Sequence, residues 1–160
     1  MRSMTSTEIQ SMVDRVRWAT ICTVSPDGRP HAIEATPFRD MADICFMINP
    51  AGQTRRNVAS NPAVLLKFTL ADWDLSGWAG VSLEGEGRFD ENPVSIRRGF
   101  ARLGKIMGGD YTSAGIAHSR KGGSSPMLRV TVREMSGRCG GRFHPVSVWE
   151  TSQPAERFLG

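Results

Sequence analysis

Between residues 18 and 89 the sequence breaks into short runs of strand-forming residues, separated by residues that favour turns. The run 19–24 is followed by a Ser-Pro-Asp-Gly stretch at 25–28, which has proline and glycine at the positions that tight turns favour. We expect a second strand over about 30–38 and a third over 44–48. This order predicts three sequential antiparallel strands in a meander, and it favours a mainly β fold.

The later runs differ in pattern. Residues 63–70 are almost continuously apolar, which predicts a strand buried on both faces and central to a barrel. Residues 78–89 alternate between apolar and polar positions, which is typical of a long half-exposed strand. Two last strands are expected over about 127–135 and 143–149, on either side of a glycine-rich turn at 136–141.

Short helices are predicted beside these strands. Thr5 and Glu8 have the spacing of a capping box, and apolar residues then recur at helical intervals through the N-terminal segment 1–17. Asn92 and Pro93 together predict the start of a second amphipathic helix.

The segment 108–125 is rich in glycine and serine and has no clear period, so we expect a mobile loop there. A chain of 160 residues that is 39% hydrophobic can bury a continuous core without disulfides or structural metal ions. We therefore expect one domain over 1–160, a β-barrel with flanking short helices.

A candidate ligand site lies at Gly52–Asn57, which follows the apolar run 44–48 and opens a predicted helix. A helix start offers unpaired backbone N–H groups and the positive end of the helix dipole. Thr54 adds a hydroxyl, and Arg55 and Arg56 add charged groups that suit a phosphate. The pattern predicts a phosphorylated cofactor, and the alternative is two solvated arginines on a surface helix.

Charge and cysteine content narrow the function classes. Twenty basic and 16 acidic residues give a net charge of +4, which suits an anionic ligand but is too mild for a nucleic-acid partner. No apolar stretch has the length of a membrane span, and the start of the sequence lacks a signal pattern, so no membrane partner is expected. Three cysteines at irregular spacing favour the reducing cytoplasm.

The remaining chemistry-bearing residues predict no metal site and identify no catalytic residue. His31, His118 and His144 show no metal-ligand spacing. Haem stays open, because a lone histidine can bind its iron, and His118 is the least constrained option. No Ser-His-Asp or Cys-His arrangement supports covalent catalysis.

Several segments occur in the order and spacing of a known family: 18–31 (WATICTVSPDGRPH), 44–48 (ICFMI), 54–58 (TRRNV) with 61–64 (NPAV), and 81–87 (VSLEGEG). In combination they resemble the pyridoxamine 5′-phosphate oxidase-like family of FMN-binding split β-barrels. The resemblance implies an antiparallel Greek-key split barrel. It also implies a homodimer with two flavin sites at the subunit interface.

The resemblance further implies which residues contact FMN. The phosphate would be held by Gln53, Thr54, Arg55 and Arg56 at the start of the short helix. The isoalloxazine ring would lie against the second and third strands, next to Ile33, Glu34, Ala35, Thr36, Ile48 and Asn49. Trp78 and Gly80 on the later strand would reach the flavin of the partner subunit.

The sequence departs from the family pattern at two of these positions. Many members carry a lysine where this chain has Thr54, and the vitamin-metabolising oxidases have a glutamine near the position of Gly80. The adjacent arginines can replace the missing charge. Arg142 and His144 resemble an Arg-x-His element that contacts substrate in those oxidases, but vitamin B6 oxidation is not the favoured reaction.

The favoured hypothesis is therefore an FMN-dependent oxidoreductase that transfers hydride between the flavin and a nicotinamide or another small organic substrate. The alternatives are a non-catalytic protein that binds flavin or haem, and a reductase that uses a deazaflavin cofactor. A small barrel that binds single-stranded nucleic acid is disfavoured, because the chain has one tyrosine and no strand with interleaved aromatic and basic residues.

Overall fold

The structure, a computed structural model, describes residues 1–114, 117 and 123–141 of the chain. The helices are α1 (Ser6–Arg15), α2 (Gln53–Ser60) and α3 (Pro93–Met107). The strands are β1 (Arg2–Ser3), β2 (Ala19–Val24), β3 (Pro30–Ala35), β4 (Phe38–Asp40), β5 (Asp43–Met47), β6 (Ala63–Ala71), β7 (Gly77–Phe89) and β8 (Met127–Gly141).

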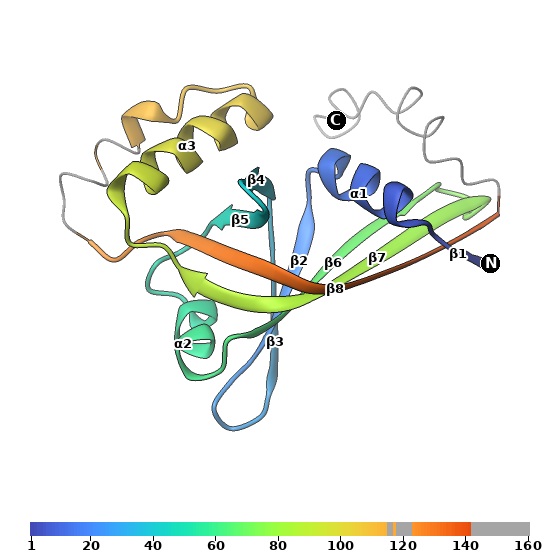
Figure 1. Ribbon diagram of the computed structural model, residues 1–160, viewed down its shortest axis with the longest axis horizontal. Coiled ribbons are helices and arrows are strands. Elements are labelled where there is room, and N and C mark those ends of the chain that lie inside the picture. Colours follow the sequence, from blue (N-terminus) through green and yellow to red (C-terminus); the bar gives the residue numbers. More distant parts are fainter. Residues whose placement is uncertain (115–116, 118–122, 142–160) are drawn as a thin grey trace.

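The eight strands in the described residues belong to one antiparallel sheet, in the order β3-β2-β6-β7-β8-β5-β4, with β1 paired to β8. The sheet curves into a half-barrel, with α1 and α3 on one side and α2 beside the β2–β3 hairpin (Figure 1). A register shift between Glu84 and Gly85 marks a bulge in the long β7–β8 ribbon. A Cβ atom at Gly85 would lie 2.4 Å from the carbonyl oxygen of Thr131, so this close approach requires glycine. The predicted mainly β split barrel is confirmed.

The predicted three-strand meander is wrong. The expected strand 30–38 is two strands, because β3 ends at Ala35 and β4 begins at Phe38. Pro37 lacks an N–H group for the ladder and restricts the backbone of Thr36. The chain therefore leaves β3 at one edge of the sheet and enters β4 at the opposite edge, where β4 forms a separate hairpin with β5.

Two other strand predictions need correction. The apolar strand β6 is not buried on both faces: Val64, Leu66 and Phe68 are buried, and the side chains between them, including Lys67, are partly exposed. The glycine-rich stretch 136–141 is not a turn, because it continues β8 and pairs with β7. The predicted strand at 143–149 lies outside the described residues.

The glycines of β8 are required by close packing against other side chains, which the sequence pattern does not reveal. A Cβ atom at Gly140 would lie 2.7 to 3.0 Å from the indole of Trp78, its cross-strand partner. A Cβ atom at Gly137 would lie 2.9 Å from the side chain of Ile9 in α1. The glycines thus let an aromatic ring and a helix lie close to the strand.

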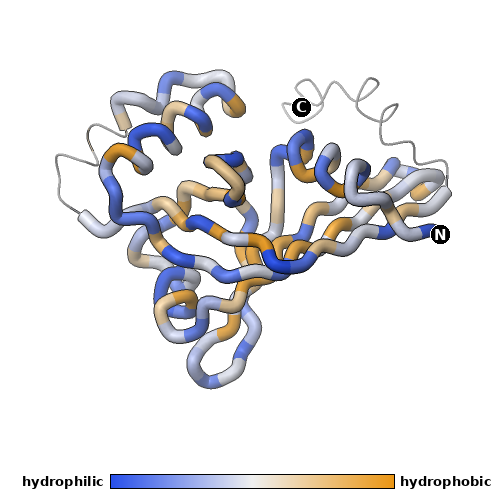
Figure 2. Tube along the Cα trace, in the orientation of Figure 1, coloured by the Kyte–Doolittle hydropathy of each residue, from blue (hydrophilic) through white to orange (hydrophobic). Residues whose placement is uncertain are grey.

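The main core contains residues of α1 and α2 and of strands β2, β5, β6, β7 and β8. Orange stretches cross at the middle of the sheet in Figure 2. The predicted capping box is confirmed, because Glu8 N donates to Thr5 Oγ1 (3.3 Å) and Thr5 N donates to Glu8 Oε2 (2.8 Å). A second, smaller cluster of Phe38, Cys45, Ile96 and Met127 lies beneath α3. The helix predicted after Asn92 is therefore also confirmed, with Asn92 as its N-cap.

The expected loop at 108–125 is in part helical, because residues 112–114 and 117 have helical backbone. His118, Arg142 and His144 lie outside the described residues. Among the helices of the described ranges, none is both long and apolar enough to cross a bilayer.

Candidate functional site

The start of α2 follows a tight turn after β5. Ala51 N donates to the side-chain oxygen of Asn49 (3.0 Å), and Gly52 N donates to the Asn49 carbonyl (3.2 Å). Gly52 is the N-cap of α2 and, having no side chain, provides no capping hydrogen bond. The first-turn N–H groups of α2 are therefore left without a side-chain cap, unlike those of α1 and α3.

Two further groups stand at this helix start. Arg56 folds back over it, donating from Nη1 to the Ala51 carbonyl (3.0 Å) and from Nη2 to Gln53 Oε1 (2.6 Å). Thr54 is only 3% exposed, and its hydroxyl has no hydrogen-bond partner within the described part of the chain. A buried hydroxyl without a partner is costly, so its position in the first turn of α2, where the N–H groups are uncapped, suits an anion.

A buried polar chain fixes α2 on the sheet. Gln53 Nε2 donates to Asn57 Oδ1 (2.6 Å), and Asn57 Nδ2 donates to Thr23 Oγ1 on β2 (2.9 Å). Asn57 is fully buried and Thr23 is 3% exposed. Asn57 and Thr23 were not predicted as site residues, although the spacing of four residues from Gln53 to Asn57 on a helix indicates that these two side chains are neighbours.

Arg55 points away from Arg56. Its guanidinium donates to Glu91 Oε1 (2.6 Å) and to the Ser125 carbonyl (2.8 Å), and it lies 4.5 Å from the ring centre of Phe89. These contacts tie α2 to the segments that follow β7 and precede β8. The charge of Arg55 is balanced by a carboxylate, whereas both acceptors of Arg56 are neutral. The predicted role of Arg55 at a phosphate stays a prediction.

The expected ring-binding residues lie on β3, just after β3, and in the segment between β5 and α2. This helix packs against β2 and β3, and β3 forms an edge of the sheet (Figure 1). Along β3, Ile33 and Ala35 pack against the core and Glu34 is exposed. Thr36 is buried and donates to the sulfur of Met107 (3.6 Å). Ile48 packs on the same core, and Asn49 forms the turn into α2.

Trp78 lies at the other end of the sheet. It stands at the start of β7, whereas α2 approaches β7 near Gly87, where Val58 would lie 3.5 Å from an added Cβ. Nine residues of strand separate these points, about 30 Å. Trp78 therefore does not contact the start of α2 in its own chain.

Trp78 lines a hollow of about 600 Å³, together with Gly80, Lys67, Ser82 and Arg138 among others. Lys67 Nζ donates to Ser82 Oγ (3.0 Å). Within the described residues neither Lys67 nor Arg138 pairs with a carboxylate. Neither Lys67 nor Arg138 was predicted as a site residue, although a lysine inside the otherwise apolar run 63–70 is unusual and could have indicated a functional position.

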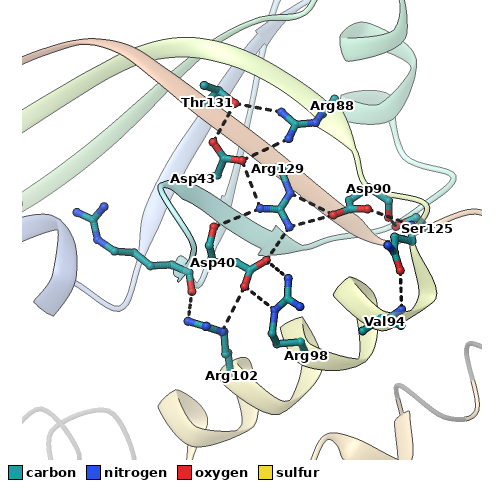
Figure 3. A network of polar contacts seen from close by, with 12 residues as sticks. Asp40, Asp43, Arg88, Asp90, Val94, Arg98, Arg102, Ser125, Arg129 and Thr131 are labelled. Atoms are coloured by element: carbon teal, nitrogen blue, oxygen red, sulfur yellow. Dashed lines mark hydrogen bonds and ion pairs between the residues drawn. The ribbon is translucent and has the colours of Figure 1, made fainter.

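A buried ionic network lies beneath α3 and is linked to Arg55 of α2 through Ser125 (Figure 3). Asp40 is fully buried and contacts Arg98 and Arg129, each at 2.7 Å. Hydrogen bonds from Arg98 and then Arg129 hold the pKa of the Asp40 carboxyl well below its usual range. The network joins β4 to α3 and β8, which indicates a structural role.

Two observations concern the Cys45 thiol and possible metal ligands in the described ranges. Burial raises the pKa of the Cys45 thiol to about 12, so this group is not a reactive thiolate. Residues 1–114, 117 and 123–141 contain no cluster of three or more His, Cys, Asp or Glu side chains suited to a metal ion.

Three solved structures are similar in fold. A conserved hypothetical protein from Mycobacterium tuberculosis has a TM-score of 0.68 and 24% identity, over 83% of this chain and 84% of its own. An FAD-binding protein from Mesorhizobium loti has a TM-score of 0.64 and 14% identity, over 88% and 98%. HutZ, the heme storage protein from Vibrio cholerae, has a TM-score of 0.63 and 14% identity, over 85% and 93%.

No curated protein matches the chain at a significant level. The sequence profile described as pyridoxamine 5′-phosphate oxidase matches residues 5–139, which is most of the chain. The segments noted in the sequence lie inside this range, and the antiparallel half-barrel agrees with it. The chain therefore belongs to the pyridoxamine 5′-phosphate oxidase-like family of split-barrel proteins.

Proposed function

We propose that this protein is a homodimeric, FMN-dependent oxidoreductase. The observation that carries the proposal is the start of α2, which has uncapped N–H groups, the unpartnered Thr54 hydroxyl and the Arg56 guanidinium folded back to the Ala51 carbonyl. Each of these groups is a donor, and together they suit the phosphate of FMN. Family membership supports the same choice of cofactor.

Different residues of the chain would provide the charge, the orientation and the ring surface for FMN. Arg56 provides the charge, because its two acceptors are neutral and leave that charge uncompensated. Gln53 orients Arg56 through one end of its amide and is itself held by Asn57 through the other. The ring would lie along the end of β3 and the residue that follows it, residues 33–36, and β3 packs beside α2. When bound, FMN supplies hydride transfer, and the protein has to hold it and admit a substrate.

The position of Trp78 supports a dimeric site. A residue about 30 Å along β7 from α2 can approach a flavin only if that flavin is held by the other subunit. The 600 Å³ hollow beside Trp78 has an excess of positive charge from Lys67 and Arg138. A phosphorylated cofactor that is shared between subunits would suit this charge.

The phosphate assignment is tested by replacing Arg56 with methionine and titrating FMN, with binding followed by the quenching of flavin fluorescence. We expect the Kd for FMN to rise at least about ten-fold, because one charge-assisted contact is lost. Arg133→Met is the matched control, since Arg133 on β8 forms an exposed ion pair with Glu86 on β7. Equal FMN affinity in Arg56→Met and the control would contradict the assignment.

Thr54→Val adds a second, independent test. Removing a buried hydroxyl that has no partner should not destabilise the fold, and it can raise the free energy of unfolding. FMN affinity should nevertheless fall several-fold. An unchanged FMN affinity would show that this hydroxyl does not serve the phosphate.

The alternative is a protein that binds a cofactor without turnover. The fold similarity to a heme storage protein favours haem as the other candidate ligand. A deazaflavin cofactor also carries a phosphate and would use the same groups of α2. The absorption spectrum of protein purified without added cofactor distinguishes flavin from haem, and the rate of flavin reduction by a reduced nicotinamide distinguishes an oxidoreductase from a binding protein.

A further inference from the structure

A second hollow of about 310 Å³ lies between α1, the β4–β5 hairpin and the C-terminal half of α3. Its apolar wall includes Val13 from α1, Phe38 from β4 and Ile106 from α3. Figure 1 shows β4 between the two helices, on the side of the sheet away from α2. Neither α2 nor β3 contributes to this wall, so the hollow is distinct from the start of α2, although Pro37 in its lining directly follows Thr36. Its volume lies at the lower end of the range for small-molecule sites.

Arg39 fixes the two sides of the hollow. Its guanidinium contacts Asp14 and Gln10 on α1. Its carbonyl accepts a hydrogen bond from Arg102 Nη1 on α3 (2.6 Å). These contacts hold both helices to β4 while the space between them stays open, so the walls are preformed.

The rim of the hollow has an excess of positive charge. Arg39 is balanced by Asp14. The carboxylate nearest to Arg102 is Asp40 at 3.5 Å, and Asp40 also faces Arg98 and Arg129 at 2.7 Å. Arg129 also pairs with Asp90 and Asp43, so the charge of Asp40 is left chiefly to Arg98 and Arg102.

Lys105 adds a further charge at the rim. It is exposed, and in the described part of the chain its ammonium group has no hydrogen bond or ion pair. The carbonyl of Ile106, near the end of α3, already accepts a hydrogen bond from Arg17 (2.7 Å), so it is not a free acceptor for Lys105. Lys105 and the weakly compensated Arg102 therefore provide two cations beside an apolar wall.

We propose that this hollow binds a small organic monoanion with a compact apolar body, of the class of medium-chain carboxylates. The apolar part would contact the wall formed by Val13, Phe38 and Ile106. The carboxylate would pair with Lys105 and Arg102 at the rim. This site is independent of the flavin, and its occupancy does not require the proposed oxidoreductase activity.

The test is a calorimetric titration of the full chain with octanoate, in the presence and absence of saturating FMN. We expect saturable binding of one octanoate per chain, unchanged by FMN. Lys105→Met should weaken this binding at least about five-fold through loss of a charged contact. Arg97→Met is the matched control, because Arg97 is an exposed cation on the same helix that does not line the hollow.

Each other outcome overturns the proposal. An absence of octanoate binding by the folded protein removes the site. Equal weakening in Lys105→Met and Arg97→Met would show general attraction to a basic protein. Competition with FMN would assign the carboxylate to the cofactor site instead. Octan-1-ol serves as the neutral probe, and binding as tight as that of octanoate would contradict the anion class.

Discussion

Arg129 Nη2 lies 2.7 Å from Asp40 Oδ2, and the two side chains are 5% and 0% exposed. This pair connects β8 to β4 across the sheet, and Arg98 of α3 joins it from the other side of the carboxylate (Figure 3). Arg129 also contacts Asp90 after β7 (2.9 Å) and Asp43 of β5 (3.3 Å). One guanidinium therefore links four segments of the fold.

Breaking this network should strongly destabilise the protein. Arg129→Met leaves buried Asp40 with fewer partners, and removing one member of a buried ion pair costs about 3–5 kcal/mol. The free energy of unfolding, measured with urea, should fall by that amount. Arg133→Met on the same strand removes an exposed pair and should cost less than about 1 kcal/mol. Similar losses in both variants would contradict the role assigned to Arg129.

The network also predicts a dependence of stability on pH. The pKa of Asp40 is lowered in the folded state, so its charged form contributes stability that is present above the unfolded pKa of about 4 and is lost as pH falls below it. Asp40→Asn should be less stable at neutral pH but should lose less stability on acidification. The remaining slope would come from groups such as Glu8, whose pKa is lowered to about 2 by its hydrogen bond with Arg2.

Urea unfolding of wild type and Asp40→Asn at several pH values between about 5 and 2 measures this difference in slope. Parallel pH profiles for the two proteins would show that Asp40 does not titrate as the buried ion pair requires.

Asn57 should affect FMN affinity only indirectly, by fixing the helix α2 that carries the phosphate-binding residues. Asn57→Ala removes the buried link from Gln53 to Thr23, which should cost about 1–3 kcal/mol of unfolding free energy. It also frees Gln53, so Arg56 should lose its orientation and the Kd for FMN should rise. Denaturation and FMN titration of the same preparation check both effects. A loss of stability with unchanged FMN affinity would separate Asn57 from the cofactor site.

The dimeric site can be tested by mixing subunits. If Trp78 serves the flavin of the partner subunit, Arg56→Met and Trp78→Ala homodimers should each bind FMN weakly. A mixed dimer would regain one intact site, with Arg56 from one chain and Trp78 from the other. Unfolding and refolding the two variants together should therefore restore tight binding to a fraction of the sites. No recovery in dimers that are shown to be mixed would contradict a shared site.

Much of the fold could be read from the sequence, because its signals are local. The capping box of α1, the N-cap of α3 and the alternation along β7 each depend on residues close in the chain. The errors arose where tertiary contacts decide. The glycines of β8 resembled a turn, but one of them makes room for Trp78. The apolar run of β6 gave no indication of a role for Lys67. Its side chain lines a hollow that forms only when β6, β7 and β8 pair.

The candidate site shows the same division. The start of α2 was readable, because a strand, a glycine and basic residues at a helix start are adjacent in sequence. The different surroundings of Arg55 and Arg56 were not, because Glu91 and Ser125 are distant in the chain and reach Arg55 only through the fold. The Asp40–Arg129 pair was invisible for the same reason, since 89 positions separate its members.

The central claim is that the start of α2 holds the phosphate of a flavin. The most direct measurement compares the Kd values of FMN and riboflavin, which lacks the phosphate, for wild type and Arg56→Met. The account predicts that wild type binds FMN far more tightly than riboflavin, and that Arg56→Met reduces this preference while leaving riboflavin binding unchanged. Equal affinity of the wild type for the two flavins, or a preference that survives in Arg56→Met, would contradict it.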